Sequence, residues 1–147
     1  MKRLLWPEAS GTLRDGPFDG WYRPLRQEEI DDLIHFHKMR RELIPYLHDA
    51  WDCDDYSEEF TYLARVWSVR NGYHETTPAV GSAFVRISGR YELFDKPVDA
   101  PPGVAHAINV IMRDDGQWFF YEPQSGKLQK IEGPCYEGVI EVVKIQI

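Results

Sequence analysis

The spacing of apolar residues changes once along this chain of 147 residues, close to residue 80. Before that point, apolar side chains recur every three or four residues, which is the period of a helix packed on one side. After it, they come in short runs separated by turn residues, which is typical of antiparallel strands. Helices followed by strands predict a single α+β domain, with N-terminal helices packed on a C-terminal antiparallel sheet. We expect it to span residues 1–147, with an irregular arm at 1–26, helices within 27–72 and strands within 80–147.

The second of two predicted helices carries the strongest pattern, with apolar residues at helical spacing across residues 56–67. Asp52 precedes this run and has the side chain of a typical N-cap. Asn71-Gly72 follows it and is a common C-terminal stop. We therefore expect a helix whose first turn begins near Cys53 and whose apolar face packs on the sheet.

Five strands are predicted after residue 80, each from an apolar or alternating run bounded by turn residues. They cover Ala83–Ile87, Ala105–Met112, Gln117–Glu122, Leu128–Ile131 and Gly138–Ile147. The segments Asp114–Gly116 and Ser125–Gly126 are expected to turn between neighbouring strands. The proline-rich stretch Pro97–Pro102 is expected to be a loop.

The composition argues against some classes of function. The formal net charge is −7 and no cluster of lysines and arginines stands out, so binding of nucleic acid through its phosphates is not expected. No apolar run is long enough to cross a bilayer, so no membrane contact is expected. The N-terminal apolar stretch Leu4–Trp6 is too short for a secretion signal, which predicts a cytoplasmic protein. The sequence leaves the oligomeric state open.

Cys53 has aspartates on both sides, in the order Asp52-Cys53-Asp54-Asp55. A thiolate is the reactive form of cysteine, and a helix N-terminus stabilises negative charge, but neighbouring carboxylates oppose it. A protonated partner would resolve this conflict. Without one, Cys53 is an inert and partly buried residue. Cys135 is either a turn residue or the partner of Cys53 in a disulfide, which a cytosolic setting disfavours.

His106 is the only one of five histidines that falls within a predicted strand. The turn at 114–116 pairs residues whose numbers sum to about 230, which sets Glu122 opposite Ile108 and diagonal to His106. A slip of one residue would turn Glu122 to the other face of the sheet. In the predicted register, Glu122 orients one ring nitrogen of His106 and the imidazole can pair with the Cys53 thiol.

Three short motifs, W-D-C-D-D-Y-S, G-V-A-H-A-I-N-V and Y-E-P-Q-S-G, occur in this order. Together they resemble the C-terminal protease domain of the fungal lectin Marasmius oreades agglutinin and its bacterial relatives. The resemblance covers roughly residues 45–130 and implies a papain-like fold with a half-barrel of strands and a catalytic triad of Cys53, His106 and Glu122. Residues 1–44 match only as a generic arm and helix. No lectin domain precedes the matching part, so carbohydrate binding is not expected.

The same resemblance implies two further features. Papain-like enzymes place an oxyanion-hole glutamine before the cysteine; this chain has none there, so His48 is the candidate donor beside the backbone N–H of Cys53. The fungal domain depends on divalent cations, with calcium the usual suggestion, and Asp54, Asp55 and Gln124 would supply oxygen ligands here. The sequence by itself requires no cofactor.

The sequence therefore predicts a cysteine peptidase or amidase that cleaves an amide bond of a peptide or protein substrate through a thioester. Cys53 would be the nucleophile, His106 the base and then the acid, and Glu122 the acceptor that orients His106. Two alternatives stay open. One is an inactive papain-like module that binds a partner or has a structural role in a larger assembly, and the other is transfer of the acyl group to an amine.

Overall fold

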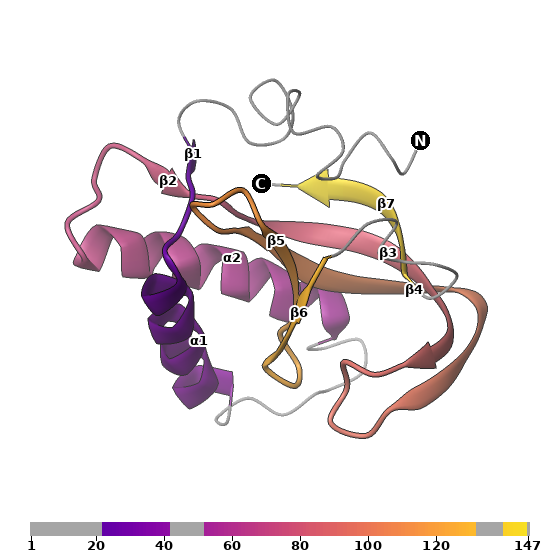
Figure 1. The fold of residues 1–147 in the computed structure, drawn as a ribbon. Helices are drawn as coiled ribbons and strands as arrows, with labels where there is room; N and C mark the ends of the chain where they lie inside the picture. Colours follow the sequence, from indigo (N-terminus) through magenta and orange to yellow (C-terminus); the bar gives the residue numbers. More distant parts are fainter. Residues whose placement is uncertain (1–21, 42–51, 132–139, 147) are drawn as a thin grey trace.

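The structure is a computed structural model, and it describes residues 22–41, 52–131 and 140–146. Two helices, α1 (Gln27–Arg41) and α2 (Cys53–Arg70), pack against an antiparallel sheet of five strands (Figure 1). In chain order the strands are β3 (Val80–Tyr91), β4 (Val98–Met112), β5 (Trp118–Glu122), β6 (Lys127–Lys130) and β7 (Ile140–Gln146). Their order in the sheet is β6-β5-β4-β3-β7. The predicted α+β class, with helices on a C-terminal antiparallel sheet, is confirmed.

Helix α2 begins and ends where the sequence predicts. Asp52 is its N-cap, and the backbone N–H of Asp52 donates to the Asp55 carboxylate at 3.1 Å, which is part of a capping box. Asn71 is its C-cap, and Gly72 follows with a φ of 88°, a conformation that glycine adopts without steric cost. Because the cap fixes the first helical residue, the Cys53 side chain is held at the very start of the helix.

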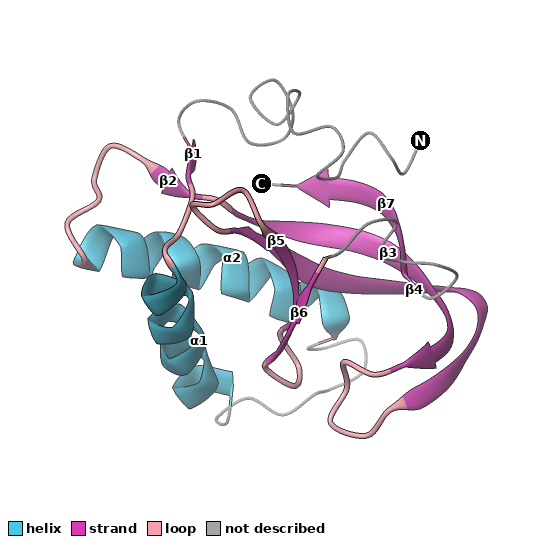
Figure 2. Ribbon diagram, in the orientation of Figure 1, coloured by secondary structure: helices cyan, strands magenta, loops and turns pink. Residues whose placement is uncertain are grey.

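The two helices lie on one face of the sheet (Figure 2). They share an apolar core with it. This core includes Ile30 and Leu33 of α1, Phe60, Ala64 and Trp67 of α2, and Ile111, Phe119 and Tyr121 of the sheet. The opposite face of the sheet has a second buried cluster, which includes Ile108 and Val110. Alternate residues of β4 therefore face different cores, as expected for a strand with both faces covered.

The hairpin of β4 and β5 has the predicted register. Asn109 lies opposite Tyr121, and Met112 lies opposite Trp118. The short turn after β4 fixes this pairing, since moving it by one residue would exchange the two faces of β5. The side chain of Glu122 therefore lies on the same face as that of His106, as expected.

Strand β4 is longer than predicted, and the prediction of a loop at Pro97–Pro102 is wrong. Residues 98–100 pair with residues 89–91 of β3, and the register shifts between Ile87 and Gly89. The two consecutive prolines of β4 lie at this irregularity. A proline has no N–H to donate to a ladder, and a bulge is a place where a strand tolerates it. The prolines thus mark a bend within the strand.

Only the end of the predicted arm, residues 22–26, lies within the described residues. There β1 (Tyr22–Arg23) pairs in parallel with β2 (Thr77–Pro78). The Arg23 guanidinium forms an ion pair with Glu29 of α1 at 3.0 Å, so the end of the arm is fixed to the first turn of that helix. No helix in the described part of the chain is long and apolar enough to cross a bilayer.

Candidate functional site

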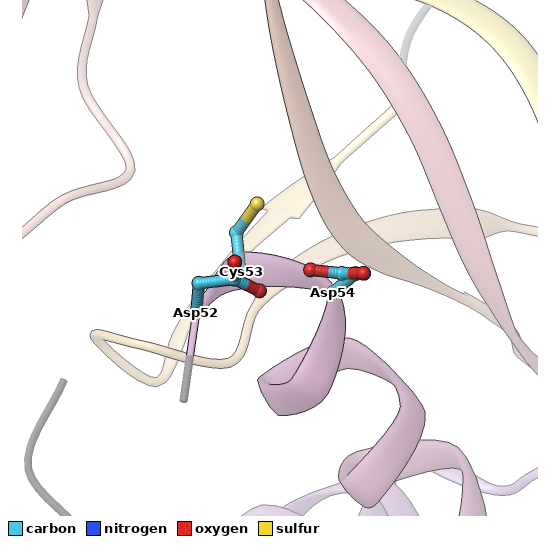
Figure 3. A group of neighbouring side chains, drawn as sticks. All are labelled: Asp52, Cys53 and Asp54. Atoms are coloured by element: carbon cyan, nitrogen blue, oxygen red, sulfur yellow. The ribbon is translucent and has the colours of Figure 1, made fainter. Parts of the chain in front are cut away.

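Cys53 is the first residue of α2, and its side chain is a partly buried free thiol. The N-terminus of a helix has N–H groups without intrahelical partners and a partial positive charge, and both favour negative charge there. The side chains of Asp52 and Asp54 lie on either side of Cys53 (Figure 3). In that view the sulfur points away from the body of the helix. The thiol is therefore accessible beyond the end of α2.

His106 of β4 and Glu122 of β5 form a buried pair. The distance from His106 Nε2 to Glu122 Oε2 is 2.7 Å, and the two side chains are 6% and 0% exposed. The β4–β5 register thus brings together the two residues that the sequence analysis places diagonally across this hairpin. Because Nε2 faces Glu122, Nδ1 is the ring nitrogen left for Cys53.

The protonation of His106 is strongly perturbed by its surroundings. Burial lowers the pKa of its imidazole, but hydrogen bonds to Cys53 and Glu122, together with their charges, raise it by more, to about 9. At neutral pH His106 therefore carries a positive charge between a thiol and a carboxylate. Of the three predicted triad residues, His106 and Glu122 are hydrogen-bonded, and Cys53 lines the same pocket as His106 and helps to raise its pKa.

Glu122 has partners that the sequence analysis did not foresee. Its Oε2 also accepts a hydrogen bond from the Tyr91 hydroxyl at 2.7 Å, and its Oε1 accepts one from the backbone N–H of Gln124 at 3.1 Å. The rings of Tyr91 and Phe94 meet the His106 ring edge to face, with centroids 5.6 and 5.2 Å away. No sequence motif marks Tyr91, because it lies beyond the apolar run that predicts its strand.

Buried hydrogen bonds fix helix α2 to β4 one turn after its N-terminus. The Ser57 hydroxyl donates to the carbonyl of Ile108 at 2.9 Å. The fully buried Asn109 amide donates to acceptors on α2 and β3, which are the Ser57 carbonyl, Thr61 Oγ1 and the Gly81 carbonyl. These bonds set the position of α2 along β4 and so place its N-terminus beside His106. The sequence does not predict this role of Asn109, because no local signal indicates which residues a polar side chain in a strand will contact.

A pocket of about 380 Å³ opens beside Cys53 and His106. Its lining includes two pairs of residues that lie opposite each other on β3 and β4, Phe84 with Ala107 and Arg86 with Ala105. Because α2 begins at Cys53, this end of the sheet is not covered by the helix, and the two alanines leave space above it. Val143 of β7 adds a further apolar side chain. The pocket is therefore mainly apolar, with the charged side chains of Asp54 and Arg86 in its lining.

Acidic side chains surround Cys53 and include potential metal ligands. Asp52, Cys53 and Asp54 each place one ligand atom within 4.8 Å of the others. Asp55 instead uses its carboxylate to cap α2, and Gln124 contributes its backbone N–H to Glu122. A hydrogen bond with Asp52 and burial raise the pKa of Asp54 above its ordinary value. A calcium site formed by Asp54, Asp55 and Gln124 stays a prediction.

Two residues of the sequence analysis lie outside the described part of the chain. His48, the candidate oxyanion donor, falls within residues 42–51. Cys135, the other cysteine, falls within residues 132–139. The roles assigned to both residues therefore stay predictions.

No family model matches this chain, and no curated protein matches it. Solved structures do match, among them PSL1a in complex with E64, and the Polyporus squamosus lectin bound to the human-type influenza-binding epitope Neu5Acα2-6Galβ1-4GlcNAc. The first has 19% sequence identity and a TM-score of 0.61 over 86% of this chain and 40% of the matched chain. The second has 18% identity and a TM-score of 0.58 over 86% and 39%. This chain therefore shares its fold with part of a fungal lectin and spans about two fifths of the matched chains.

Proposed function

We propose that this chain is a cysteine hydrolase that cleaves an amide bond through a thioester intermediate. Cys53 is the nucleophile, His106 transfers the proton, and Glu122 orients His106. One observation carries the proposal. The buried His106 imidazole is hydrogen-bonded through Nε2 to the Glu122 carboxylate at 2.7 Å, and it also interacts with Cys53, the only cysteine among the described residues, at the N-terminus of α2. A strongly perturbed group beside a nucleophile in a pocket is typical of an active site.

The proposed reaction begins with the Cys53 thiolate paired with the protonated His106. The sulfur attacks the carbonyl carbon of the substrate, and a new S–C bond forms as the C=O bond becomes an oxyanion. When the oxyanion collapses, the C–N bond breaks and Nδ1 of His106 gives its proton to the departing amine. Water then attacks the thioester, His106 takes a proton from it, and the acid product leaves with Cys53 restored.

The first turn of α2 supplies donors for the oxyanion. The N–H groups at the start of a helix have no intrahelical partners, so the backbone N–H of Cys53 is available to stabilise a developing negative charge. His48 remains the proposed second donor. Glu122 stays ionised in this scheme and holds the imidazole in one orientation while its charge favours the imidazolium.

The pocket beside Cys53 fits a peptide or protein substrate. A volume of about 380 Å³ lies at the small end of the range for ligand sites, and it has room for a side chain or two. Its lining by Phe84, Val143 and two alanines favours an apolar side chain of the substrate. We propose that such a side chain, next to the scissile bond, occupies it.

The test is labelling and turnover in a Cys135→Ala background, which leaves Cys53 as the only thiol. The probe is E64, an epoxide that reacts with thiols and the compound present in one matched structure. We expect covalent addition at Cys53 by mass spectrometry, and cleavage of amide substrates with apolar side chains. Cys53→Ala should abolish both, and His106→Ala should slow labelling by about 10²-fold or more. Full amide cleavage by Cys53→Ala would contradict the proposal.

The same assay, run with and without added calcium, examines the proposed metal dependence. Adding an amine nucleophile examines acyl transfer, because the amine would then appear in the product. Both measurements compare the same protein with Cys53→Ala, so they separate a reaction at this thiol from a contaminating activity.

A binding role is the second candidate, and the matched structures favour it because both are of a lectin. In this case the chain is a module of a larger assembly and Cys53 is idle. Binding of the epitope Neu5Acα2-6Galβ1-4GlcNAc by this chain, with no thiol reactivity beyond that of free cysteine, would favour it. The largely apolar lining of the pocket argues against a sugar in this particular pocket, because carbohydrate hydroxyl groups need polar partners.

A further inference from the structure

The Glu122 carboxylate is shared between two side-chain donors. Oε2 lies 2.7 Å from His106 Nε2 and also 2.7 Å from the Tyr91 hydroxyl oxygen. Tyr91 and Glu122 are almost completely buried, with exposed fractions of 1% and 0%. The phenol can only donate to an ionised carboxylate, so Tyr91 and His106 compete for the negative charge on one oxygen.

The position of the Tyr91 ring is fixed independently of this hydrogen bond. Tyr91 is the last residue of β3, and its ring packs in the buried cluster on the face of the sheet opposite the helices. Its ring also meets the rings of Phe94 and His106 edge to face, at centroid distances of 4.8 and 5.6 Å. The hydroxyl therefore reaches Glu122 from a rigid support.

The loop after β3 is held down over the same pair. Ser125 Oγ donates to the carbonyl of Leu93, and Lys127 Nζ donates to the carbonyl of Phe94 at 2.7 Å. These contacts hold the segment that carries Phe94, whose ring lies against His106, and the His106 and Glu122 side chains are only 6% and 0% exposed. In a dry environment a change in one hydrogen bond is felt strongly by its neighbours.

The groups that face the His106 ring are few and can be named. Cys53 faces it from α2, Glu122 from β5 and Tyr91 from β3, with the apolar Phe94 beside them. The charged residues Asp54 and Arg86 line the pocket that His106 also reaches. Within the described residues, Tyr91 is the one neutral side chain that donates to Glu122 Oε2, the oxygen that pairs with His106, while Oε1 accepts from the backbone N–H of Gln124.

We infer that Tyr91 is a positioning residue of this site, whose hydroxyl draws off part of the Glu122 charge and so limits how tightly His106 holds its proton. This role rests on the proposed function of the triad, because a proton held too tightly cannot pass to a leaving amine. Tyr91 touches neither substrate nor thiol in this account and acts only through Glu122.

The expected effect of Tyr91→Phe follows from the loss of that donor. Glu122 Oε2 then accepts a side-chain hydrogen bond from His106 alone. The negative charge of the carboxylate is stabilised less by other donors, so it favours the protonated form of His106 more strongly. The pKa of His106 should therefore rise by about half to one pH unit. A more weakly acidic imidazolium donates its proton more slowly, so kcat should fall by about three- to tenfold with KM nearly unchanged.

The experiment is an NMR titration of the His106 ring in the wild type and in Tyr91→Phe, with the signal identified by its loss in His106→Gln. Tyr121→Phe is the matched control. Tyr121 is equally buried, and its hydroxyl lies 2.8 Å from His37 Nδ1, on the helix side of the sheet. Tyr121→Phe also removes a buried hydroxyl, but one that does not bond to Glu122. It therefore reports any effect on the His106 pKa that comes from removing a buried tyrosine hydroxyl in general.

A rise of the His106 pKa in Tyr91→Phe, with no change in Tyr121→Phe, is the expected result. An unchanged or lowered value in Tyr91→Phe, or equal shifts in both variants, would overturn the role of Tyr91. The titration needs no turnover, so it decides this inference even if Cys53 proves unreactive. An unreactive Cys53 in the wild type would instead remove the proposed function and leave the hydrogen-bond account standing.

Discussion

The pH dependence of stability should be dominated by His106 between neutral and mildly alkaline pH. Its pKa is raised from 6.5 to about 9 by Cys53 and Glu122, so the folded state binds this proton more tightly than the unfolded chain. The resulting stabilisation is complete below about pH 6.5 and is lost as the pH rises through about 9. Stability should therefore fall in this window, where a chain without such a group would change little.

The size of this loss follows from the same values. A difference of about 2.5 pH units, at about 1.4 kcal/mol per unit, gives up to about 3.5 kcal/mol of unfolding free energy. This is a large fraction of the stability of a typical small domain, so it should be visible as a shift of the unfolding midpoint. Since His106 is almost fully buried, solvent screening reduces the value only modestly.

The assay is urea unfolding of the wild type and of His106→Gln at about pH 6 and about pH 9.5. Gln has a similar size and can still donate to Glu122, but it does not titrate. The wild type should lose about 2–3 kcal/mol between the two conditions and His106→Gln less than about 1 kcal/mol. The same loss in both proteins, or no loss in the wild type, would refute the assignment of a raised pKa to His106.

Three further predictions concern other parts of the site. Asn109→Ala removes the amide that joins α2 to the sheet, so the unfolding free energy should fall by about 2–3 kcal/mol and alkylation of Cys53 should slow. An unchanged alkylation rate in a destabilised protein would show that these hydrogen bonds do not position the thiol. Glu122→Gln should reduce kcat by about 10²-fold or more while the fold persists by circular dichroism, and wild-type turnover would exclude an orienting role. Ala107→Phe should fill the pocket, so labelling of Cys53 by E64 should slow at least about tenfold while its rate with the small reagent iodoacetamide stays within about twofold. Equal slowing with both reagents would contradict the proposal that the substrate binds in this pocket.

Local signals explain what the sequence predicted well. The N-cap at Asp52 and the stop at Asn71-Gly72 are short-range features, so the start of α2 at Cys53 follows from a few residues. The pairing of His106 with Glu122 follows from a short turn, because the turn fixes the register and the register fixes which side chains share a face. The contact between His106 and Glu122, two of the three proposed catalytic residues, is therefore predicted by the strand register alone.

Long-range contacts explain what the sequence did not predict. Tyr91 reaches Glu122 only because β3 continues beyond its apolar run, and that continuation depends on pairing with β4 beyond a bulge. The acceptors of the Asn109 amide belong to α2 and β3, and no spacing in one sequence names them. The pocket likewise depends on long-range packing, because it lies where α2 begins at Cys53 and leaves that end of the sheet uncovered.

In the proposed mechanism, Cys53 reacts as a thiolate paired with protonated His106. The most direct test of this mechanism is the rate of alkylation of Cys53 by iodoacetamide as a function of pH, in the Cys135→Ala background, with and without His106→Ala. We predict fast alkylation that persists well below the free-cysteine pKa of about 8.5, and its loss in His106→Ala. A slow reaction that rises only near the free-thiol pKa, and is the same in both proteins, would contradict the account.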